Sequence, residues 1–263
     1  MAALKVSGIC GSPHTNGLCA KLLKEALAGS EEAGAKTDLI FLGEKDIKPC
    51  IDCMISPCWE EMKCNLDDSG IELREKINES DAIILSAPVY FLSVNGLTKN
   101  FMDRMRYYGK NGKPALPIAL AGGTGKGCII TLQEICRWLL MLGFRPINPL
   151  PVTRYDIDIA LTEVKKKGMS LVKEECRPFS NLAEKIAWYE SLPYMRWGIV
   201  EEISYIAKLS IDRIGRSGRP ELATDLQKKL ERGNALMRAG RYAEGVKLVV
   251  EAHEESMHIF DRL

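Results

Sequence analysis

Short apolar runs alternate with amphipathic helical patterns through about residue 190. Each run ends in Gly, Pro or polar residues, as buried parallel strands do. The runs occupy residues 4–10, 37–42, 81–88, 114–123 and, more weakly, 144–153. This alternation predicts an α/β fold with a doubly wound, five-stranded parallel sheet and helices on both of its faces.

The pattern becomes purely helical near the C-terminus, with breaks at 213–220 and 238–242. We therefore predict a sheet domain over residues 1–192, closed by a helix within 154–192, and a helical extension over 193–263. Residues 233–256 resemble one helical hairpin of a tetratricopeptide-type repeat. A single hairpin cannot form a solenoid, so packing or oligomer contact is expected of it. His253 and His258 are five residues apart on a polar helix, and we interpret both as solvated.

The charge balance argues against nucleic acid and membrane partners, because 36 Lys and Arg oppose 35 Asp and Glu. The first residues lack a signal-peptide pattern, and no apolar run reaches the roughly 18 residues of a membrane span. A cytoplasmic location is therefore expected. In such a reducing compartment, nine cysteines point to metal binding or redox chemistry rather than to disulfides.

Unusual segments follow the strands, at the ends where open parallel sheets bind ligands. They are residues 11–17, 47–68, 88–96 and 122–127, and we expect them to meet at one rim. The first segment turns from a strand into a helix, whose N–H groups and dipole suit a phosphate. Ser12, Thr15 and Asn16 would add donors, although Thr15 or Asn16 also fits the simpler role of a helix cap.

The glycines of "GGTGKG" (122–127) do not form an ATP-type phosphate loop, because the required spacing and the Ser or Thr after Lys126 are missing. They would instead let the backbone pass close to a flat ligand.

Four cysteines crowd into residues 47–68 with the spacing C-x2-C-x4-C-x5-C: Cys50, Cys53, Cys58 and Cys64. Zinc sites of four cysteines usually pair two C-x2-C hooks, and only one hook is present. A compact run of four thiolates is typical of an iron-sulfur cluster. Iron-sulfur, zinc and a metal-free reduced loop all stay open on this evidence.

Three segments, "GICGSPHTNG", "KPCIDCMISPCWEEMKCNLDD" and "DAIILSAPVYFLSVNGLTKNFMDR", resemble in order and spacing the NADPH-dependent FMN reductase family of flavodoxin-like proteins. The resemblance is greatest to the iron-sulfur flavoprotein branch and covers about residues 4–190. It implies a flavodoxin-like fold, an FMN cofactor, NAD(P)H or a ferredoxin-like protein as electron donor, and a homodimer. It also implies a 4Fe-4S cluster on the four cysteines.

The resemblance also assigns cofactor-binding residues. They are Ser12, His14, Thr15, Asn16 and Gly17 around the FMN phosphate, Pro88, Val89, Tyr90 and Phe91 beside the isoalloxazine ring, and Gly122, Gly123, Thr124 and Gly125 over its far edge. Leu18 and Cys19 stand where the family has Asn-Thr, so we expect FMN to bind more weakly than in relatives.

The two cofactors together predict a converter between two-electron and one-electron transfer, because a flavin accepts hydride and a cluster moves single electrons. No catalytic residue is assigned, and Tyr90 is expected to contact the ring by stacking or by its edge. Two alternatives remain: a flavin-only quinone or nitro-compound reductase with silent cysteines, and a non-enzymatic flavodoxin-like binding module. Arg213, Arg216 and Arg219 would either hold the extra phosphate of NADPH or form a basic linker.

Overall fold

The computed structural model describes residues 3–53, 58, 64–105 and 111–263. Its parallel sheet has the order β2-β1-β3-β5, and β6 and β7 both pair with the far edge of β5. The strands are β1 (Lys5–Cys10), β2 (Lys36–Phe41), β3 (Ala82–Tyr90), β5 (Pro114–Ala121), β6 (Arg145–Pro146) and β7 (Leu150–Thr153). A two-residue strand, β4 (Ser93–Val94), folds back antiparallel on the end of β3. The predicted doubly wound sheet is confirmed.

The strand predicted over 144–153 is interrupted. Pro146 and Pro149 cannot donate ladder hydrogen bonds, and Asn148 between them has a φ of 46°. The chain therefore pairs with β5 twice, as β6 and then as β7.

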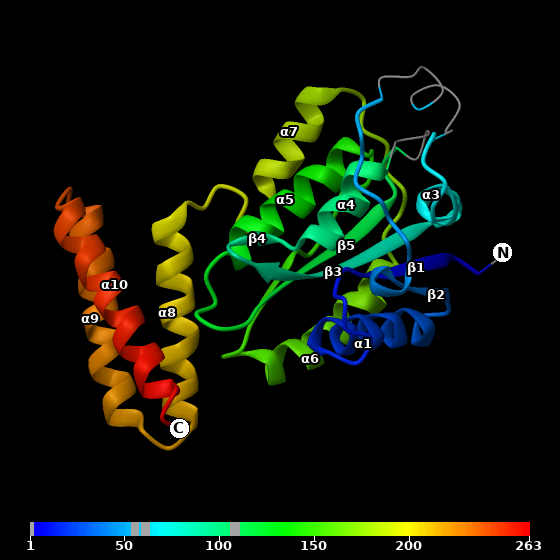
Figure 1. Cartoon of the computed structure of the whole chain (residues 1–263). Coiled ribbons are helices and arrows are strands. Elements are labelled where there is room, and N and C mark those ends of the chain that lie inside the picture. The colour runs from blue at the N-terminus through cyan, green and yellow to red at the C-terminus, as the bar shows by residue number, and fades with distance from the viewer. Residues whose placement is uncertain (1–2, 54–57, 59–63, 106–110) are drawn as a thin grey trace.

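Helices cover both faces of the sheet (Figure 1). Helices α1 (Leu18–Glu32) and α6 (Ile157–Leu171) pack on one face, and α3 (Gly70–Glu79), α4 (Gly96–Arg104) and α5 (Cys128–Met141) pack on the other. Successive residues of β3 serve opposite faces, as the pleat requires: Ile84 belongs to the core under α1, and Ile83 and Leu85 to the core under α4 and α5.

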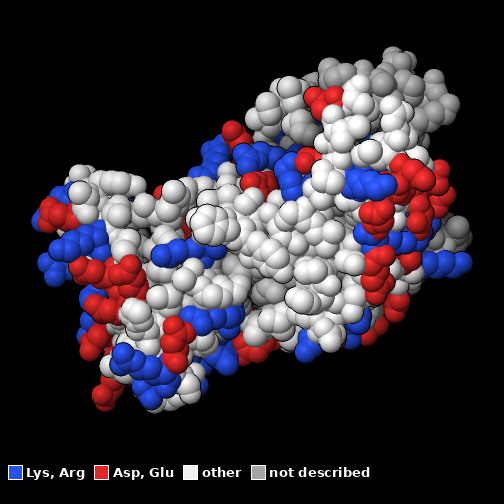
Figure 2. All heavy atoms as spheres, viewed as in Figure 1, with Lys and Arg blue, Asp and Glu red and all other residues white. Residues whose placement is uncertain are grey.

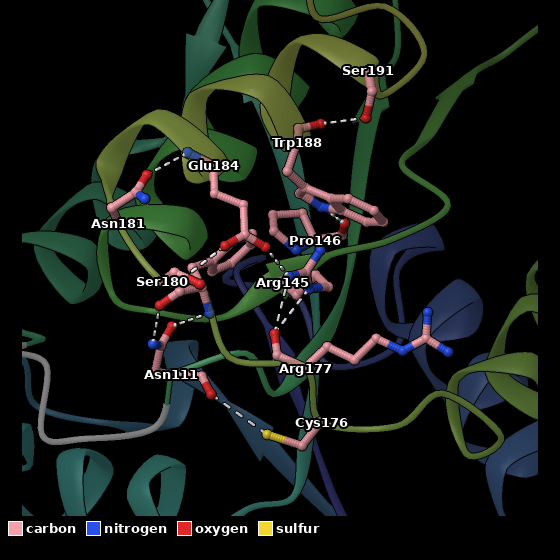
Figure 3. Close-up of polar contacts among 11 residues, drawn as sticks. Asn111, Arg145, Pro146, Cys176, Arg177, Ser180, Asn181, Glu184, Trp188 and Ser191 are labelled. Atoms are coloured by element: carbon pink, nitrogen blue, oxygen red, sulfur yellow. Dashed lines mark hydrogen bonds and ion pairs between the residues drawn. The ribbon is translucent and has the colours of Figure 1, made fainter.

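The single closing helix expected within 154–192 is wrong, because two helices form there. After α6, an extended segment leads to α7 (Leu182–Ser191), whose first turn is capped by the side chain of Asn181. Arg145 holds this segment, donating to the carbonyl of Arg177 at 3.1 and 3.0 Å (Figure 3). Its guanidinium also lies 3.9 Å from the centre of the Phe179 ring.

Three further helices lie beside the end of the sheet toward which its parallel strands point (Figure 1). They are α8 (Ile199–Arg216), α9 (Pro220–Arg238) and α10 (Tyr242–Phe260), and they share a core that includes Ile211, Leu230 and Val249. Both breaks that the sequence predicted fall between them. A division into two domains at residue 193 stays a prediction, since α8 also contacts the sheet domain.

The packing of the extension changes the interpretation of one of its two histidines. His253 is 1% exposed because it shares one stripe of α10 with Val249, Ala252 and Ser256, so its interpretation as solvated is wrong. Burial, with the nearby charge of Lys126, lowers the pKa of His253 to about 4. His258 is exposed, as expected.

Within the described ranges, no helix is both long enough and apolar enough to cross a membrane.

Candidate functional site

The loop after β1 is fixed to the start of α4. The N–H of Gly11 donates to the carbonyl of Ser86 at 2.8 Å, and the Gly11 carbonyl accepts from Asn95 Nδ2 at 2.9 Å and Thr98 Oγ1 at 3.1 Å. A Cβ at Gly11 would lie 2.1 Å from that Thr98 oxygen, so only glycine fits. This close approach sets the direction in which the chain enters residues 12–17.

The N-terminus of α1 is free of side-chain caps among the described residues. Its N-cap is Gly17 in an extended conformation, and its first turn contains no acidic residue. Neither Thr15 nor Asn16 caps the helix, so the simpler interpretation of these two residues is not supported. Exposed His14 and Asn16 border the loop, and Ser12 Oγ accepts from the N–H of His14 at 3.1 Å. Free amides at a helix start form an environment that favours an anion.

A pocket of about 440 Å³ opens beside this loop, between the β3–β4 hairpin and the β5–α5 loop. That volume is in the range of small-molecule sites. Its lining is Leu18, Pro88, Val89, Tyr90, Phe91, Leu92, Leu120, Ala121, Gly122, Gly123, Thr124, Lys126 and Arg154.

The structure thus gathers seven of the predicted residues in one pocket: 88–91 and 122–124. Gly125 is not among them, because it is buried against Ile206 of α8. Residues 12–17 also lie outside the lining, and Leu18, the first residue of α1, connects them to it.

The tip of the β3–β4 hairpin is apolar, exposed and strained. Phe91 and Leu92 have φ angles of 47° and 70°, which bulky residues rarely adopt. Phe91 is 100% exposed, and Tyr90 and Leu92 are about half exposed. Figure 2 shows few charged side chains over the middle of this face, where Figure 1 places the hairpin.

Two contacts fix the hairpin in place. Glu134 of α5 accepts from Ser93 Oγ at 2.8 Å and from the N–H of Val94 at 3.3 Å. Gly127, which has a φ of 87°, packs directly against the backbone of Leu92. A Cβ at position 127 would lie only 2.4 Å from the Leu92 Cα, so a side chain there would push the hairpin away. The pocket wall is therefore held from the neighbouring helix.

Two cationic residues of the pocket were missed from the sequence: Lys126 and Arg154. Arg154 directly follows β7, so the rule that ligands bind at carboxyl ends of strands would have included it. Its guanidinium pairs with Asp261 at 2.7 Å and lies 5.0 Å from the Phe260 ring centre. Burial alone would lower the pKa of Arg154. Its hydrogen bonds to Tyr155 and Asp261 outweigh that effect, so the pKa is raised.

The described cysteines of residues 47–68 are not gathered into a metal site. Cys50 is exposed, Cys53 and Cys64 are half-buried, and Cys58 is buried. In the part of the chain that the structure describes, no three His, Cys, Asp or Glu side chains lie close enough to hold a metal ion. Residues 54–57 and 59–63 of the predicted loop lie outside that part.

The cysteine loop also departs from the expected meeting of four loops at one rim. Cys64 accepts a hydrogen bond from Arg104 at 3.3 Å, and Arg104 is the last residue of α4. The first turn of α4 is the part that touches Gly11 at the rim. The described end of the cysteine loop therefore lies a helix length away from the pocket.

Comparison with known proteins identifies the family and the fold. A sequence model for NADPH-dependent FMN reductases matches residues 4–152, which carry the loops after β1, β3 and β5. The chain belongs to the NADPH-dependent FMN reductase family. As a member of that family it is a flavin-dependent oxidoreductase, so the alternative of a non-enzymatic binding module is not supported.

The curated relatives of this FMN reductase family member are named iron-sulfur flavoproteins. One from Methanocaldococcus jannaschii is 37% identical over 142 residues, 52% of this chain and 72% of its own. One from Archaeoglobus fulgidus is 28% identical over 187 residues, 69% of this chain and 93% of its own. Among solved structures, the NAD(P)H:quinone oxidoreductase from Methanothermobacter marburgensis matches the fold with a TM-score of 0.51 at 17% identity, covering 65% of this chain and all of its own.

Proposed function

We propose that the protein transfers electrons from NAD(P)H, or from a ferredoxin-like donor, to an acceptor through FMN and a 4Fe-4S cluster. The observation that carries the flavin part is the position of the pocket. It opens at the carboxyl ends of β3 and β5, and Leu18 connects it to the uncapped start of α1. The N–H groups of residues 12–17 would hold the FMN phosphate, and the ring would lie between residues 88–91 and 122–124.

The residues of the pocket have distinct tasks in this proposal. Bound FMN supplies the ability to accept hydride and to release electrons singly. Pro88, Tyr90 and Phe91 would orient the ring and exclude water from its edge. Lys126 adds positive charge to the wall, which favours the reduced, electron-rich ring, whereas Asp261 balances the charge of Arg154. No side chain is required as an acid or a base.

The cluster part depends on the chemistry of the donors and on the relatives' names. Four cysteines within 15 residues, counted from Cys50 to Cys64, suit a 4Fe-4S cluster. Their described positions do not yet form a site, so binding would have to draw the loop together, as metal binding does in many small sites. A cytoplasmic, reducing location stays a prediction, and it would keep these thiols free.

A homodimer also belongs to the proposal. The exposed tip formed by Tyr90, Phe91 and Leu92 leaves adjoining apolar side chains in water beside the pocket, and contiguous exposed apolar surface usually marks a contact. Light scattering at micromolar concentration should report two chains. A pure monomer would contradict this part alone.

The deciding experiment is anaerobic purification, followed by absorbance spectra and by assays of iron, acid-labile sulfide and zinc. We expect flavin bands above broad iron-sulfur absorbance, with about four iron and four sulfide atoms per chain. Flavin bands without iron would favour the flavin-only reductase, and stoichiometric zinc without sulfide would favour a zinc site. Replacing Cys50, Cys53, Cys58 and Cys64 with Ala should remove the iron and leave the flavin. Cys176→Ala, which removes an exposed free thiol outside the loop, is the matched control and should change neither.

The donor is tested in the same preparation. Under anaerobic conditions NADPH or NADH should bleach the flavin bands. If neither nucleotide reduces the flavin while reduced ferredoxin does, the ferredoxin-like donor is the correct one.

A further inference from the structure

Two cations from different parts of the chain line the same pocket: Lys126, in the β5–α5 loop, and Arg154, after β7. Arg154 lies outside residues 4–152, the region that the family match covers. Its guanidinium pairs with Asp261 at 2.7 Å and lies 5.0 Å from the centre of the Phe260 ring. The end of α10 therefore positions a charge on the pocket wall.

The charge of Lys126 is not balanced within the part of the chain that the structure describes. This half-buried side chain forms no ion pair there. Burial, together with the charge of Lys126, lowers the pKa of the neighbouring His253 to about 4, so this imidazole is neutral at pH 7. A cation without a carboxylate partner on the wall of a pocket attracts anionic ligands.

The contacts of Arg154 leave part of its hydrogen-bonding capacity unused. Nη1 forms the ion pair with Asp261, and Nη2 donates to the Tyr155 hydroxyl at 3.3 Å. The buried Nε has no acceptor among the described residues, although proteins rarely leave such a donor unpaired. An oxyanion such as a phosphate can accept from two nitrogens of a guanidinium at once. Arg154 therefore has donors left for an anion.

The carboxylate of Asp261 can be displaced at small cost. Its side chain is 45% exposed, and ion pairs of this exposure contribute little to stability. Asp261 is also the C-cap residue of α10, where the negative end of the helix dipole disfavours a carboxylate. An incoming anion can therefore take its place on Arg154.

We propose that Lys126 and Arg154 form a subsite for an anionic group of the substrate that exchanges electrons in this pocket, and that Asp261 occupies Arg154 until that substrate binds. Asp261 then acts as an internal competitor, which lowers the affinity for the substrate. Two sources fit this chemistry: the phosphates of a nicotinamide dinucleotide donor and the acidic group of a small acceptor. The inference rests on the proposed function, because it requires a flavin substrate to enter this pocket.

The test is calorimetric titration of FMN-loaded protein with two probes that do not reduce the flavin. NADP⁺ represents the donor, and anthraquinone-2-sulfonate represents an acidic acceptor. Arg154→Gln and Lys126→Gln should each raise the Kd of the responding probe about tenfold, as expected for the loss of a hydrogen bond to a charged group. Asp261→Asn should instead lower that Kd, by up to about fivefold, because the competing ion pair is exposed.

Arg213→Gln is the matched control. Arg213 also belongs to a partly exposed ion pair with an aspartate, Asp158 at 2.8 Å, but it does not line this pocket. The Kd of either probe should stay at its wild-type value in this variant. Opposite shifts in Arg154→Gln and Asp261→Asn separate competition from damage, since disruption of the pocket would weaken binding in both.

The FMN content of every sample is measured by absorbance, which separates two kinds of failure. A wild type that does not take up FMN would overturn the proposed function and this inference with it. An FMN-loaded wild type that binds neither probe, or an Arg154→Gln variant that binds both as wild type does, would overturn the inference alone. An equal loss in Arg213→Gln would do the same. If Arg154→Gln does not fold, Lys126→Gln and Asp261→Asn decide: opposite shifts support the inference, and any other result overturns it.

Discussion

The carboxylate of Glu202, on α8, accepts a hydrogen bond at 2.8 Å from the N–H of Ile129, in the first turn of α5. Glu202 is 3% exposed, and α5 has no side-chain cap of its own among the described residues. Helix α5 begins directly after Gly127, and residues 122–124 and 126 of the preceding loop line one wall of the pocket. The C-terminal extension, outside the region that the family match covers, therefore completes the support of that wall.

Glu202→Ala should destabilise the protein and weaken FMN binding. Losing the carboxylate leaves buried N–H groups at the start of α5 without an acceptor, which costs about 1–3 kcal/mol. The residues 122–127 then lose their anchor, so the Kd for FMN should rise. Denaturant unfolding and fluorescence titration measure the two effects. Glu202→Gln keeps an oxygen acceptor and should be at least as stable as wild type at neutral pH; equal losses in both variants would contradict the capping role.

Stability should also depend on the ionisation of Glu202. Burial raises its pKa above the ordinary 4.5, although N–H groups of Ile129, Gly127 and Cys128 oppose the rise. The folded state therefore holds this proton more tightly than the unfolded state. The contribution of Glu202 is greatest below pH 4.5 and is lost as the pH rises through the raised pKa. Unfolding free energies across this range should show wild type losing stability relative to Glu202→Gln, and a slope of the opposite sign would refute the assignment.

The sequence predicted the sheet and most of the pocket because both depend on local signals. Apolar runs bounded by Gly and Pro identify buried strands, and the ends of those strands identify residues 88–91 and 122–124. Arg154 was missed although it follows the last strand, because its orientation depends on Asp261 and Phe260, more than 100 residues later. The burial of His253 has the same origin: packing of α10 on α8 follows from the tertiary structure rather than from any motif.

Sequence patterns likewise did not predict on which side of the sheet domain the described end of the cysteine loop lies. Its position after β2 predicted the rim, but the buried Arg104–Asp68 pair holds its end beside the last turn of α4. Both residues end segments that resemble the family, but no local pattern indicated that they pair with each other across 36 positions in the sequence.

Acid should weaken the protein through Asp68. Burial alone would raise the pKa of this carboxyl, but hydrogen bonds from Arg104 and from the N–H groups of Gly70 and Lys48 lower it from 3.8 to about 2. Its contribution, about 2 kcal/mol from 1.36 kcal/mol per pH unit, is complete above pH 3.8 and is lost as the pH falls through about 2. Acid unfolding curves should show that the difference between wild type and Asp68→Asn shrinks over that range. Asp67→Asn changes a neighbouring exposed residue and should follow wild type.

Leu18→Glu should separate helix stability from phosphate binding. A carboxylate at the first residue of α1 interacts favourably with the helix dipole, by about 0.3–1 kcal/mol, yet it repels a phosphate bound there. About 1 kcal/mol of repulsion would raise the Kd for FMN about fivefold. Leu18→Gln is the neutral control of the same shape. Fluorescence quenching should show that riboflavin, which has no phosphate, binds both variants equally; an equal loss for riboflavin and FMN in the Glu variant would place the phosphate elsewhere.

Phe91→Asn should stabilise the fold and impair the site. Phe91 and Leu92 both have positive φ, as the central residues of a tight two-residue hairpin do, and Asn is a preferred residue at such positions. Replacing Phe91 should relieve strain worth about 1 kcal/mol in unfolding free energy.

The same change removes an aromatic side chain from the pocket edge, so FMN should bind more weakly. Phe91→Tyr keeps the ring and the backbone strain, and it should alter neither the unfolding free energy nor the affinity for FMN. Unfolding, FMN titration and light scattering on the three proteins distinguish the possible roles of this side chain. If Phe91→Asn gains stability and keeps FMN affinity but dissociates to monomers, the strained tip is retained for the partner subunit rather than for the flavin. If Phe91→Asn does not gain stability, the positive φ of Phe91 does not destabilise the protein. If the variant also keeps its affinity for FMN, the assignment of Phe91 to the cofactor site is wrong.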